Sequence, residues 1–294
     1  MIIVKLMGGL GNQMFQAAAG FALSKQQNTK LKLDLSFLRE NNVSTESFTA
    51  REYELGIFNT RFEVATQDEI DLFYHNRKRG LFANILRRIK RPVILAEDYN
   101  VDGYFLNSRK YSLIDGYWQN EKYFSHLRNE IIDLFRFPTL PTELSKIEEE
   151  VKQSNAVSLH FRRGDYVSIE KTNNYHGICS LDYYYRAMAI LASYNTEYSY
   201  FVFSDDIEWV KSNLDCPNKK IVFIDRDIFK DNWNDLYLMS LCKHNIIANS
   251  SFSWWGAWLN NNPDKIVIAP INWFNDKTIS SQTKDLIPEK WLRI

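Results

Sequence analysis

The sequence has few cysteines, and their spacing suggests neither a crosslink nor a metal centre. Among its 294 residues only Cys179, Cys216 and Cys242 are cysteines, and they lie far apart. No Cys-x-x-Cys pair occurs, which excludes a zinc ribbon and a dithiol redox centre. An odd number of scattered cysteines is typical of a reducing compartment, so we expect a cytoplasmic protein.

Long apolar runs and a net charge are also missing. No run of about 18 apolar residues occurs, so no membrane-spanning helix is expected. The first residues, Met1-Ile-Ile-Val-Lys-Leu6, are too short for the apolar core of a secretory signal. The 36 Lys and Arg residues balance 36 Asp and Glu residues, so no overall positive field favours nucleic acid. An anionic ligand must therefore be held by a local group of side chains.

The remaining composition predicts a globular α/β protein with two domains. Hydrophobic residues make up 45% and charged residues 24% of the chain, whose length suits two domains of about 100–200 residues each. Short apolar runs alternate with helical patterns, an order typical of parallel βαβ units that bind ligands at the carboxyl ends of their strands. Phe137-Pro-Thr-Leu-Pro141 breaks the pattern. We predict domains of residues 1–140 and 141–294, with the last residues as candidates to pack back on the first domain.

A glycine-rich turn follows the first predicted strand. Gly8-Gly-Leu-Gly-Asn-Gln13 stands between the strand at 2–6 and a predicted helix from Met14 to Lys25. Such a turn lets backbone N–H groups approach a ligand at the positive end of a helix. Neither the dinucleotide-binding spacing nor the phosphate-loop lysine is present. The residues alone therefore leave open whether the glycines bind a ligand or only form a tight turn.

Two adjacent arginines stand where a buried strand of the second half is expected to end. The strand at 156–159 is followed by His160-Phe-Arg-Arg-Gly-Asp-Tyr166. A guanidinium presents a planar fork of donors that matches phosphate oxygens, so Arg162 and Arg163 form a candidate anion clamp. The alternative is that either arginine pairs with Asp165 or with a more distant acid and only fixes a loop.

Two further predicted strands of the second half also end in polar side chains. One is followed by Ser204-Asp-Asp206, and the other by Asn249-Ser-Ser-Phe-Ser253 at the start of a helix. Hydroxyl and N–H groups at a helix N-terminus can bind an anion without a metal. The alternative is that Ser250 or Ser251 is only a helix cap.

Taken together, these stretches resemble the bacterial α-1,2-fucosyltransferases of glycosyltransferase family eleven. The resemblance runs from residue 8 to 258 through the glycine turn, the arginine pair, Phe203-Ser-Asp-Asp206 and the stretch 248–258, with further likeness at 116–124 and 176–180. It implies a GT-B architecture of two Rossmann-like domains facing a cleft, the first on the acceptor side and the second binding GDP-fucose. It also implies inverting transfer of L-fucose from GDP-β-L-fucose to the 2-hydroxyl of a terminal galactose-type acceptor, with no metal or other cofactor.

The resemblance further implies roles for individual residues. The donor is expected to contact the arginine pair, the serine stretch that begins at Asn249 and several other side chains. The full set is His160, Arg162, Arg163, Ser204, Asp205, Asp235, Asn249, Ser250, Ser251 and Phe252. Within this set, the resemblance places the arginines at the GDP phosphates, His160 near the nucleoside and Asp235 at the guanine. In the first domain, Gly9, Asn12 and Gln13 would reach into the cleft.

Inverting transfer also needs a base within hydrogen-bond reach of the acceptor hydroxyl. The candidates are Asp165, Glu170 and His176, which follow the arginine pair. Of these, His176 has the convenient pKa. The residues do not decide among the three, and a base from the first domain is the alternative.

Other functions compete on specific features. Asp225-Arg-Asp227 follows a predicted strand and would suit Mn²⁺ or Mg²⁺ in a metal-dependent nucleotide-sugar transferase. A non-catalytic protein that binds GDP-sugars or glycans could have kept the clamp and lost the chemistry, although none of the motifs is degenerate. A nucleotide hydrolase is disfavoured because the phosphate-loop lysine is missing.

A basic segment in the first half suggests a membrane contact. Between His75 and Pro92 there are seven Lys and Arg residues and no acid. On a helix beginning near Gly80, the apolar residues would share one face and basic residues would surround it: Phe82, Ile85, Leu86 and Ile89, with Arg87, Arg88, Lys90 and Arg91. We therefore predict that residues 75–92 touch the anionic inner membrane surface, which would suit a lipid-linked acceptor. The alternative is an amphipathic helix packed on its own domain.

Overall fold

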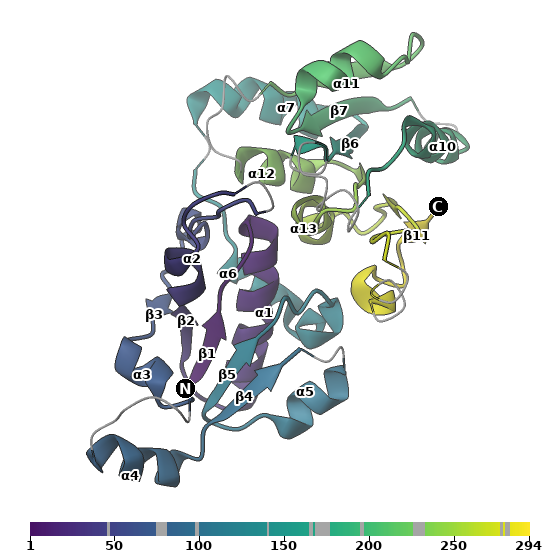
Figure 1. The fold of residues 1–294 in the computed structure, drawn as a ribbon. Coiled ribbons are helices and arrows are strands. Elements are labelled where there is room, and N and C mark those ends of the chain that lie inside the picture. The colour runs from purple at the N-terminus through teal and green to yellow at the C-terminus, as the bar shows by residue number, and fades with distance from the viewer. Residues whose placement is uncertain are drawn as a thin grey trace. The chain divides into compact units, whose positions relative to one another are not determined.

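The computed structural model describes residues 1–294 except 46–47, 75–80, 98–99, 140, 165–166, 168–176, 195–196, 226–232, 277–278 and 280–282, and only the backbone of 81–83. The chain forms two compact units (Figure 1). The first comprises residues 1–45 and 49–137, and the second comprises residues 138–294 with Phe48. The division falls at Pro138, inside the proline-containing break between Phe137 and Pro141.

The first unit is an α/β unit built on a parallel sheet. Its elements are β1 (Ile2–Lys5), α1 (Leu10–Gln26), β2 (Leu31–Asp34), α2 (Ser36–Glu40), η1 (Leu55–Ile57), β3 (Glu63–Val64), α3 (Gln67–Asp71), α4 (Leu81–Lys90), β4 (Val93–Ala96), α5 (Val101–Asn107), β5 (Ser112–Asp115), η2 (Glu121–Tyr123), η3 (Ser125–Leu127) and α6 (Arg128–Leu134). The strand order is β3-β2-β1-β5-β4, and all pairings are parallel. In register, Ile2 of β1 lies opposite Leu31 on one side and Ser112 on the other.

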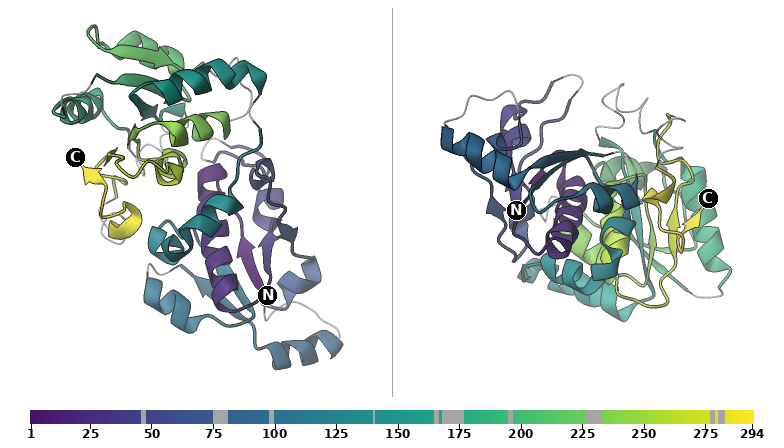
Figure 2. Two further views of the ribbon diagram at one scale, coloured as in Figure 1. Left: turned by 180° about the vertical axis from the view of Figure 1, so that it is seen from behind. Right: turned by 90° about the horizontal axis from the view of Figure 1, so that it is seen from below.

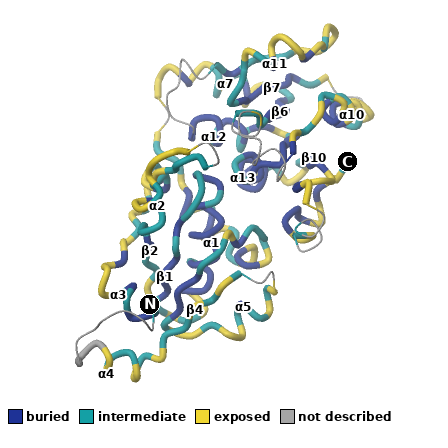
Figure 3. Tube along the Cα trace, viewed as in Figure 1, coloured by how far each residue is buried: buried dark blue, intermediate teal, exposed yellow. Residues whose placement is uncertain are grey.

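Helix α1 packs against this sheet so closely that one position accepts only glycine. A Cβ atom at position 20 would lie 2.1 Å from Val4 Cγ2 and 3.0 Å from Leu31 Cδ1. The preceding residues of the helix, Ala17, Ala18 and Ala19, are small and fully buried. Because α1 begins at the end of β1, this packing fixes the glycine turn that joins them (Figures 1 and 3).

We expect Gly20→Ala to destabilise the protein by about 1–3 kcal/mol, because an added methyl group in a packed core forces its neighbours to shift. The clash with Val4 Cγ2 gives a specific control. The double variant Gly20→Ala with Val4→Ala should lose less stability than the two single losses added together. Urea unfolding of the four proteins measures this coupling, and strict additivity would contradict the proposed contact.

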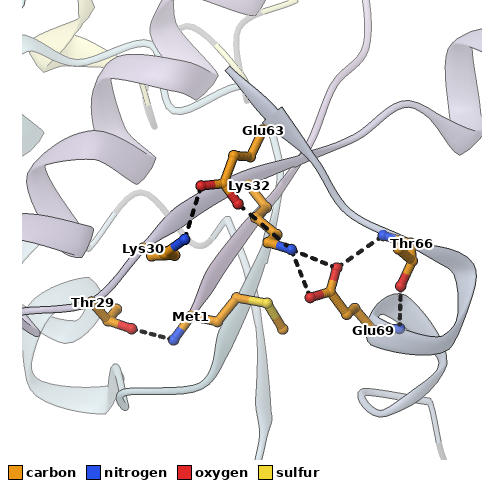
Figure 4. Close-up of polar contacts among 7 residues, drawn as sticks. All are labelled: Met1, Thr29, Lys30, Lys32, Glu63, Thr66 and Glu69. Carbon is orange, nitrogen blue, oxygen red and sulfur yellow. Dashed lines mark hydrogen bonds and ion pairs between the residues drawn. The ribbon is translucent and has the colours of Figure 1, made fainter. Parts of the chain in front are cut away.

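A polar network ties the outer strands of the first sheet to α3. Lys32 Nζ lies 2.7 Å from Glu69 Oε1 and 3.7 Å from Glu63 Oε2 (Figure 4). The hydrogen bond to Glu69 is the main reason that the pKa of Lys32 is raised. Glu69 also accepts from the Thr66 N–H at 2.9 Å and completes a capping box at the start of α3. One lysine thus connects β2, β3 and α3.

The second unit contains a second parallel sheet. Its elements are η4 (Thr142–Leu144), α7 (Ser145–Gln153), β6 (Ala156–Phe161), α10 (Leu181–Ala192), β7 (Ser199–Ser204), α11 (Ile207–Asn213), β8 (Lys220–Phe223), α12 (Trp233–Leu241), β9 (His244–Ile246), α13 (Ser251–Leu259), β10 (Val267–Ala269), η6 (Lys284–Leu286) and β11 (Leu292–Arg293). The strand order is β11-β10-β9-β6-β7-β8. The last residues form β11, which pairs with β10. They therefore belong to the second unit.

Helices cover both faces of the second sheet, which is why its central strand is buried throughout. Val157 and Leu159 of β6 face a cluster that includes Tyr183 and Tyr184 of α10. Ala156, on the opposite face, joins a cluster with residues of α7 and α12. Figure 2 shows the ribbon of this unit from two further directions, with helices on both sides of its sheet. Strands buried on both faces are typical of doubly wound sheets, which expose their functional side chains only at the strand ends. No helix in the described part of the chain is long and apolar enough to cross a membrane.

Candidate functional site

Three neighbouring strands of the second sheet end in the polar stretches that the sequence singled out. Strand β6 lies between β9 and β7, and all three are parallel. Their carboxyl ends therefore meet at one edge of the sheet, which we call the carboxyl edge. The arginine pair follows β6, Asp205 and Asp206 follow β7, and the serine stretch follows β9.

An aspartate after β7 holds both arginines after β6. Arg162 Nη1 lies 2.8 Å from Asp205 Oδ2, and the backbone N–H of Arg163 donates to Asp205 Oδ1 at 2.8 Å. The sequence left open whether the arginines pair with Asp165 or with a more distant acid, and the structure shows a more distant acid, Asp205. The carboxylate fixes the direction of the Arg162 guanidinium, whose side chain keeps 22% of its surface exposed.

Arg163 is anchored more firmly inside the second unit. Its Nε donates to Asp206 Oδ2 at 3.2 Å, and its guanidinium carbon lies 3.3 Å from the centre of the Trp209 ring. A cation stacked on an indole face gains electrostatic attraction in addition to its ion pair. Asp206 also accepts from the Trp209 N–H at the start of α11. These contacts hold the Arg163 guanidinium beside α11, whereas Asp205 orients that of Arg162, and binding of an anion by either arginine stays a prediction.

The glycine after the arginines leaves room for the Asp205 carboxylate. A Cβ atom at position 164 would lie 2.6 Å from Asp205 Oδ2 and 3.1 Å from its Cγ. The same Oδ2 atom binds Arg162. Any larger residue at this position must displace the carboxylate that holds the guanidinium.

The N-terminus of α13 offers a second group of donors at the carboxyl edge. Ser250 stands at the N-cap position with extended backbone, but its side chain makes no capping hydrogen bond. The interpretation of Ser250 as only a helix cap is therefore not supported. The first-turn N–H groups of a helix have no acceptor within the helix, and its dipole adds partial positive charge there. These groups include the N–H groups of Ser251 and Phe252, the first residues of α13.

The aromatic ring of His160 connects β6 to this helix start. His160 is buried, and its ring centre lies 6.0 Å from that of Phe252. Its backbone carbonyl accepts from the Tyr184 hydroxyl at 2.9 Å, and Tyr184 stacks on Phe161 with ring centres 3.8 Å apart. Helix α10 thus fixes the end of β6 from the opposite face of the sheet.

Two residues that are expected to bind the donor also make hydrogen bonds within the carboxyl edge. The buried Ser204 hydroxyl accepts from the Asp206 N–H at 3.0 Å. The buried Asn249 amide donates to the carbonyls of Gly177 and Trp273, at 3.2 and 3.3 Å, and its Oδ1 accepts from Cys179. These contacts hold the edge in place, and donor binding by Ser204 or Asn249 stays a prediction.

Helix α12 brings one expected and one unexpected residue to the same edge. It leads from β8 to β9, so its first turn returns to the carboxyl edge of a parallel sheet. That turn contains Asp235, which is buried. It also contains Asn234, whose buried Oδ1 has no hydrogen-bond partner among the described residues. In the sequence, Asn234 could have been recognised as a candidate site residue because it forms a polar pair with Asp235 at the start of an otherwise apolar helix.

Several candidates fall outside the described residues. Asp165, Glu170, His176 and Asp227 are among them. Asp225 is described and lies 3.5 Å from Lys211 Nζ. Within the described ranges, no group of three or more His, Cys, Asp and Glu side chains is arranged to hold a metal ion.

The glycine turn lies at the carboxyl edge of the first sheet. Gly8 has a φ of +74°, and a Cβ atom there would lie 2.4 Å from Asn12 Nδ2. Gly9 is the N-cap residue of α1, and Asn12 Oδ1 accepts from the Gln119 amide at 2.7 Å. This hydrogen bond joins the turn to the chain after β5.

Gln13 is buried beside the glycine turn. It is fully buried, and its amide donates to the carbonyls of Gly8 and Glu52 at 2.9 and 2.7 Å. Its Oε1 accepts from the Glu54 N–H at 2.9 Å. Both ends of the side chain thus hold the loop at 52–54, and the expected contact of Gln13 with the acceptor stays a prediction.

A strained residue lies beside the glycine turn. Trp118 has a φ of +55°, which is uncommon for a bulky residue, and it is buried. The backbone N–H groups of Tyr117 and Trp118 both donate to the Glu97 carboxylate, at 2.7 and 2.8 Å. Strain of this kind is concentrated at functional sites, which marks this edge as a candidate ligand surface.

The comparisons with known proteins agree with this arrangement. The family model described as Glycosyl transferase family 11 matches residues 85–294. The chain is 36% identical to an alpha-1,2-colitosyltransferase of Escherichia coli, over all of this chain and 98% of that protein. It is 34% identical to the O-antigen biosynthesis glycosyltransferase WbnK of Escherichia coli, over 95% of this chain and 97% of that protein.

A solved structure shows the fold. The fucosyltransferase NodZ from Bradyrhizobium aligns with a TM-score of 0.50 and 12% identity, covering 87% of this chain and 91% of NodZ. The GT-B prediction of two Rossmann-like α/β units is thereby confirmed. With the family model matched over most of the chain and two full-length relatives above 30% identity, the chain belongs to glycosyltransferase family 11.

Proposed function

We propose that the chain transfers L-fucose from GDP-β-L-fucose to the 2-hydroxyl of a terminal galactose-type sugar, with inversion and without a metal ion. The observation that carries the proposal is the Arg162 guanidinium, held by Asp205 at the same sheet edge as the N-terminus of α13. In this proposal the second unit binds the donor and the first unit binds the acceptor.

The charge that develops in the reaction explains why these groups suit it. Breaking the bond between fucose and the diphosphate leaves negative charge on the leaving β-phosphate. A fixed guanidinium and the partial positive charge of a helix N-terminus bind this charge more strongly in the transition state than in the ground state. Because Asp205 already orients Arg162, little reorganisation is needed during the reaction.

Other residues of the edge would recognise the nucleoside. Asp235 lies in the first turn of α12, where a buried carboxylate can accept from the N–H groups of guanine. The His160 ring, in contact with Phe252, would lie beside the nucleoside. The proposal therefore assigns the diphosphate to Arg162 and α13, and the base to α12.

The acceptor side rests on the glycine turn of the first unit. Gly9, Asn12 and the chain after β5 would bind the acceptor, with Asn12 oriented by Gln119. The proposed bases that take the acceptor proton are Asp165, Glu170 and His176. A single variant of one of them that keeps GDP-fucose binding and loses turnover would identify the base. Retained turnover in all three would place the base elsewhere, with the first unit as the alternative.

A related donor is a second candidate, because one relative is named an alpha-1,2-colitosyltransferase. Colitose is L-fucose without its 3-hydroxyl, so the two GDP-sugars differ at one position far from the diphosphate. A site built to hydrogen-bond that hydroxyl would reject the deoxy sugar strongly, whereas an apolar site would discriminate weakly. The α-1,2 linkage in the relative's name supports the proposed regiochemistry for either donor.

The test is a transfer assay with both donors and a small panel of β-galactosides. We expect a product with an α-1,2 linkage, identified by NMR, and no product from the matching 2-deoxygalactoside. A higher kcat/KM with GDP-colitose would replace fucose by colitose as the donor. GDP binding without release of GDP from either donor over the whole panel would favour a non-catalytic binding protein.

We expect turnover to persist in excess EDTA, since the arginine and the helix N-terminus supply the positive charge that a metal would otherwise provide. The measurement compares initial rates before and after chelation, with Mn²⁺ and Mg²⁺ added back. A loss that either ion restores would contradict the proposal. It would favour the metal-dependent alternative with Asp225 and Asp227.

A further inference from the structure

One side of helix α4 packs against the core of the first unit. Leu86 packs against a buried cluster that includes Ile3, Phe73 and Leu113. One turn further on, Lys90 Nζ lies 4.6 Å from the centre of the Tyr111 ring. The helix expected from the sequence is thus confirmed, but Leu86 does not share the exposed face with the two isoleucines.

The opposite side of the helix exposes a mixed apolar and basic strip. Ile85 and Ile89 lie one turn apart and keep 50% and 73% of their surface exposed. Arg88 is also exposed and lies three residues after Ile85, on the same side of the helix. Two large apolar side chains and a cation therefore lie together on the exposed side of the helix, among the residues whose side chains the structure describes.

The fold adds further cations that the sequence does not place there. Pairing of β4 with β5 brings the loop before β5 to the end of α4, where Arg109 Nη1 donates to the Arg91 carbonyl at 3.4 Å. Lys110 follows, and Arg91, Arg109 and Lys110 are exposed. Within the described part of the chain, no ion pair holds Arg88, Arg91, Arg109 or Lys110.

We propose that this basic apolar surface, formed by Ile85, Arg88, Ile89, Arg91, Arg109 and Lys110, docks on a lipid bilayer with anionic headgroups. Charge complementarity with the headgroups and the two exposed isoleucines together favour this occupant. Isoleucine side chains can enter the boundary between headgroups and acyl chains while the cations bind phosphates around them. A nucleic acid would use the cations but would leave the isoleucines without a partner. Because the net charge of the chain is zero, attachment depends on this local surface.

The attraction should be useful but reversible. Each cation near an anionic membrane surface strengthens binding by about fivefold, and salt screens the effect. Burying part of two isoleucines adds a contribution that does not depend on salt. A protein held in this way binds at low ionic strength and is partly released at high ionic strength.

The test is sedimentation of the full chain with vesicles of phosphatidylcholine alone or mixed with phosphatidylglycerol. We expect binding only to the mixed vesicles, weakened by salt. Two double variants test the surface: one combines Ile85→Ser with Ile89→Ser, and the other combines Arg88→Glu with Arg109→Glu. Each should bind the mixed vesicles at least about tenfold more weakly than the wild type. The matched controls, Ile271→Ser and Arg186→Glu, change equally exposed residues of the second unit and should bind like the wild type.

Two outcomes would overturn the proposal. One is equal recovery of the wild type in the supernatant with both kinds of vesicle. The other is a loss of binding in the arginine variant without a loss in the isoleucine variant, which would indicate a site for a soluble polyanion such as nucleic acid. Thermal unfolding and transfer to a soluble acceptor should be unchanged in all four variants. This control separates the membrane proposal from the proposed function, because vesicle binding is measured without donor or acceptor.

Discussion

Arg162→Ala should lower the rate of sugar transfer by about a hundred- to thousandfold, the cost of removing one donor that stabilises developing negative charge. Asp205 orients the Arg162 guanidinium at the carboxyl edge, whereas Asp206 and Trp209 hold that of Arg163. Arg162→Lys should fail almost as severely, because an ammonium group cannot reproduce the planar fork. The measurement is kcat/KM for transfer, together with thermal unfolding to show that the fold is intact.

Arg186→Ala is the matched control for this loss. Arg186 also lies in the second unit and pairs with an aspartate, Asp182, at 2.9 Å, but both side chains are mostly exposed on α10. Surface pairs of this kind contribute little to stability, so activity and unfolding should be nearly unchanged. Normal activity in Arg162→Ala, or equal losses in both variants, would contradict a specific role for Arg162.

Gly164→Ala should lower transfer by about a hundredfold although it removes no functional group, since a misplacement of about 1 Å in a catalytic group can cost that much. The new Cβ would lie 2.6 Å from Asp205 Oδ2, so the carboxylate must move away from Arg162. The expected signature is non-additivity, because Gly164→Ala combined with Asp205→Ala should be little worse than Asp205→Ala alone. Steady-state kinetics of the three variants measures this.

Gly56→Ala provides the comparison for Gly164→Ala. Its added Cβ would meet only the Tyr53 ring at 3.3 Å, in the first unit. We expect transfer close to the wild-type rate. If Gly164→Ala is equally active, Asp205 can move without disturbing Arg162, and the carboxylate does not orient the arginine as proposed.

The strands and helices of the second unit were predictable because its pattern is strong. Strands β6 and β7 are buried throughout and mostly apolar, and helices of regular length separate the strands of this unit. Parallel pairing then brings their carboxyl ends to one edge, which is why the arginine pair, Asp205 and the serine stretch could be grouped from the sequence. The pairing partner of each arginine could not be predicted, since it depends on loop conformation after β6 and β7.

The first unit was harder to predict because several of its elements are short. Strand β3 has two exposed residues, and its pairing with β2 depends on Lys32 and the acids around it. Helix α3 is five residues long and is defined by its capping box more than by an apolar face. The exposed isoleucines of α4 were predicted, but the approach of Arg109 follows from strand pairing that no local pattern reveals.

The roles of amide side chains also escaped prediction. Gln13 and Asn249 stand in motifs that suggested ligand contacts, yet both are buried and hold neighbouring loops. A sequence shows that an amide is present but not whether a carbonyl of a distant loop occupies it. Asn234 is the opposite case, with a buried Oδ1 that no described residue binds.

The central claim is that Arg162 binds the diphosphate of a GDP-sugar, and calorimetric titration with GDP and GMP tests it most directly. The wild type should bind GDP more tightly than GMP, because only GDP carries the second phosphate. Arg162→Ala should lose most of that difference while keeping its affinity for GMP, since guanine contacts from α12 remain. An unchanged ratio of GDP to GMP affinity in Arg162→Ala would contradict the account.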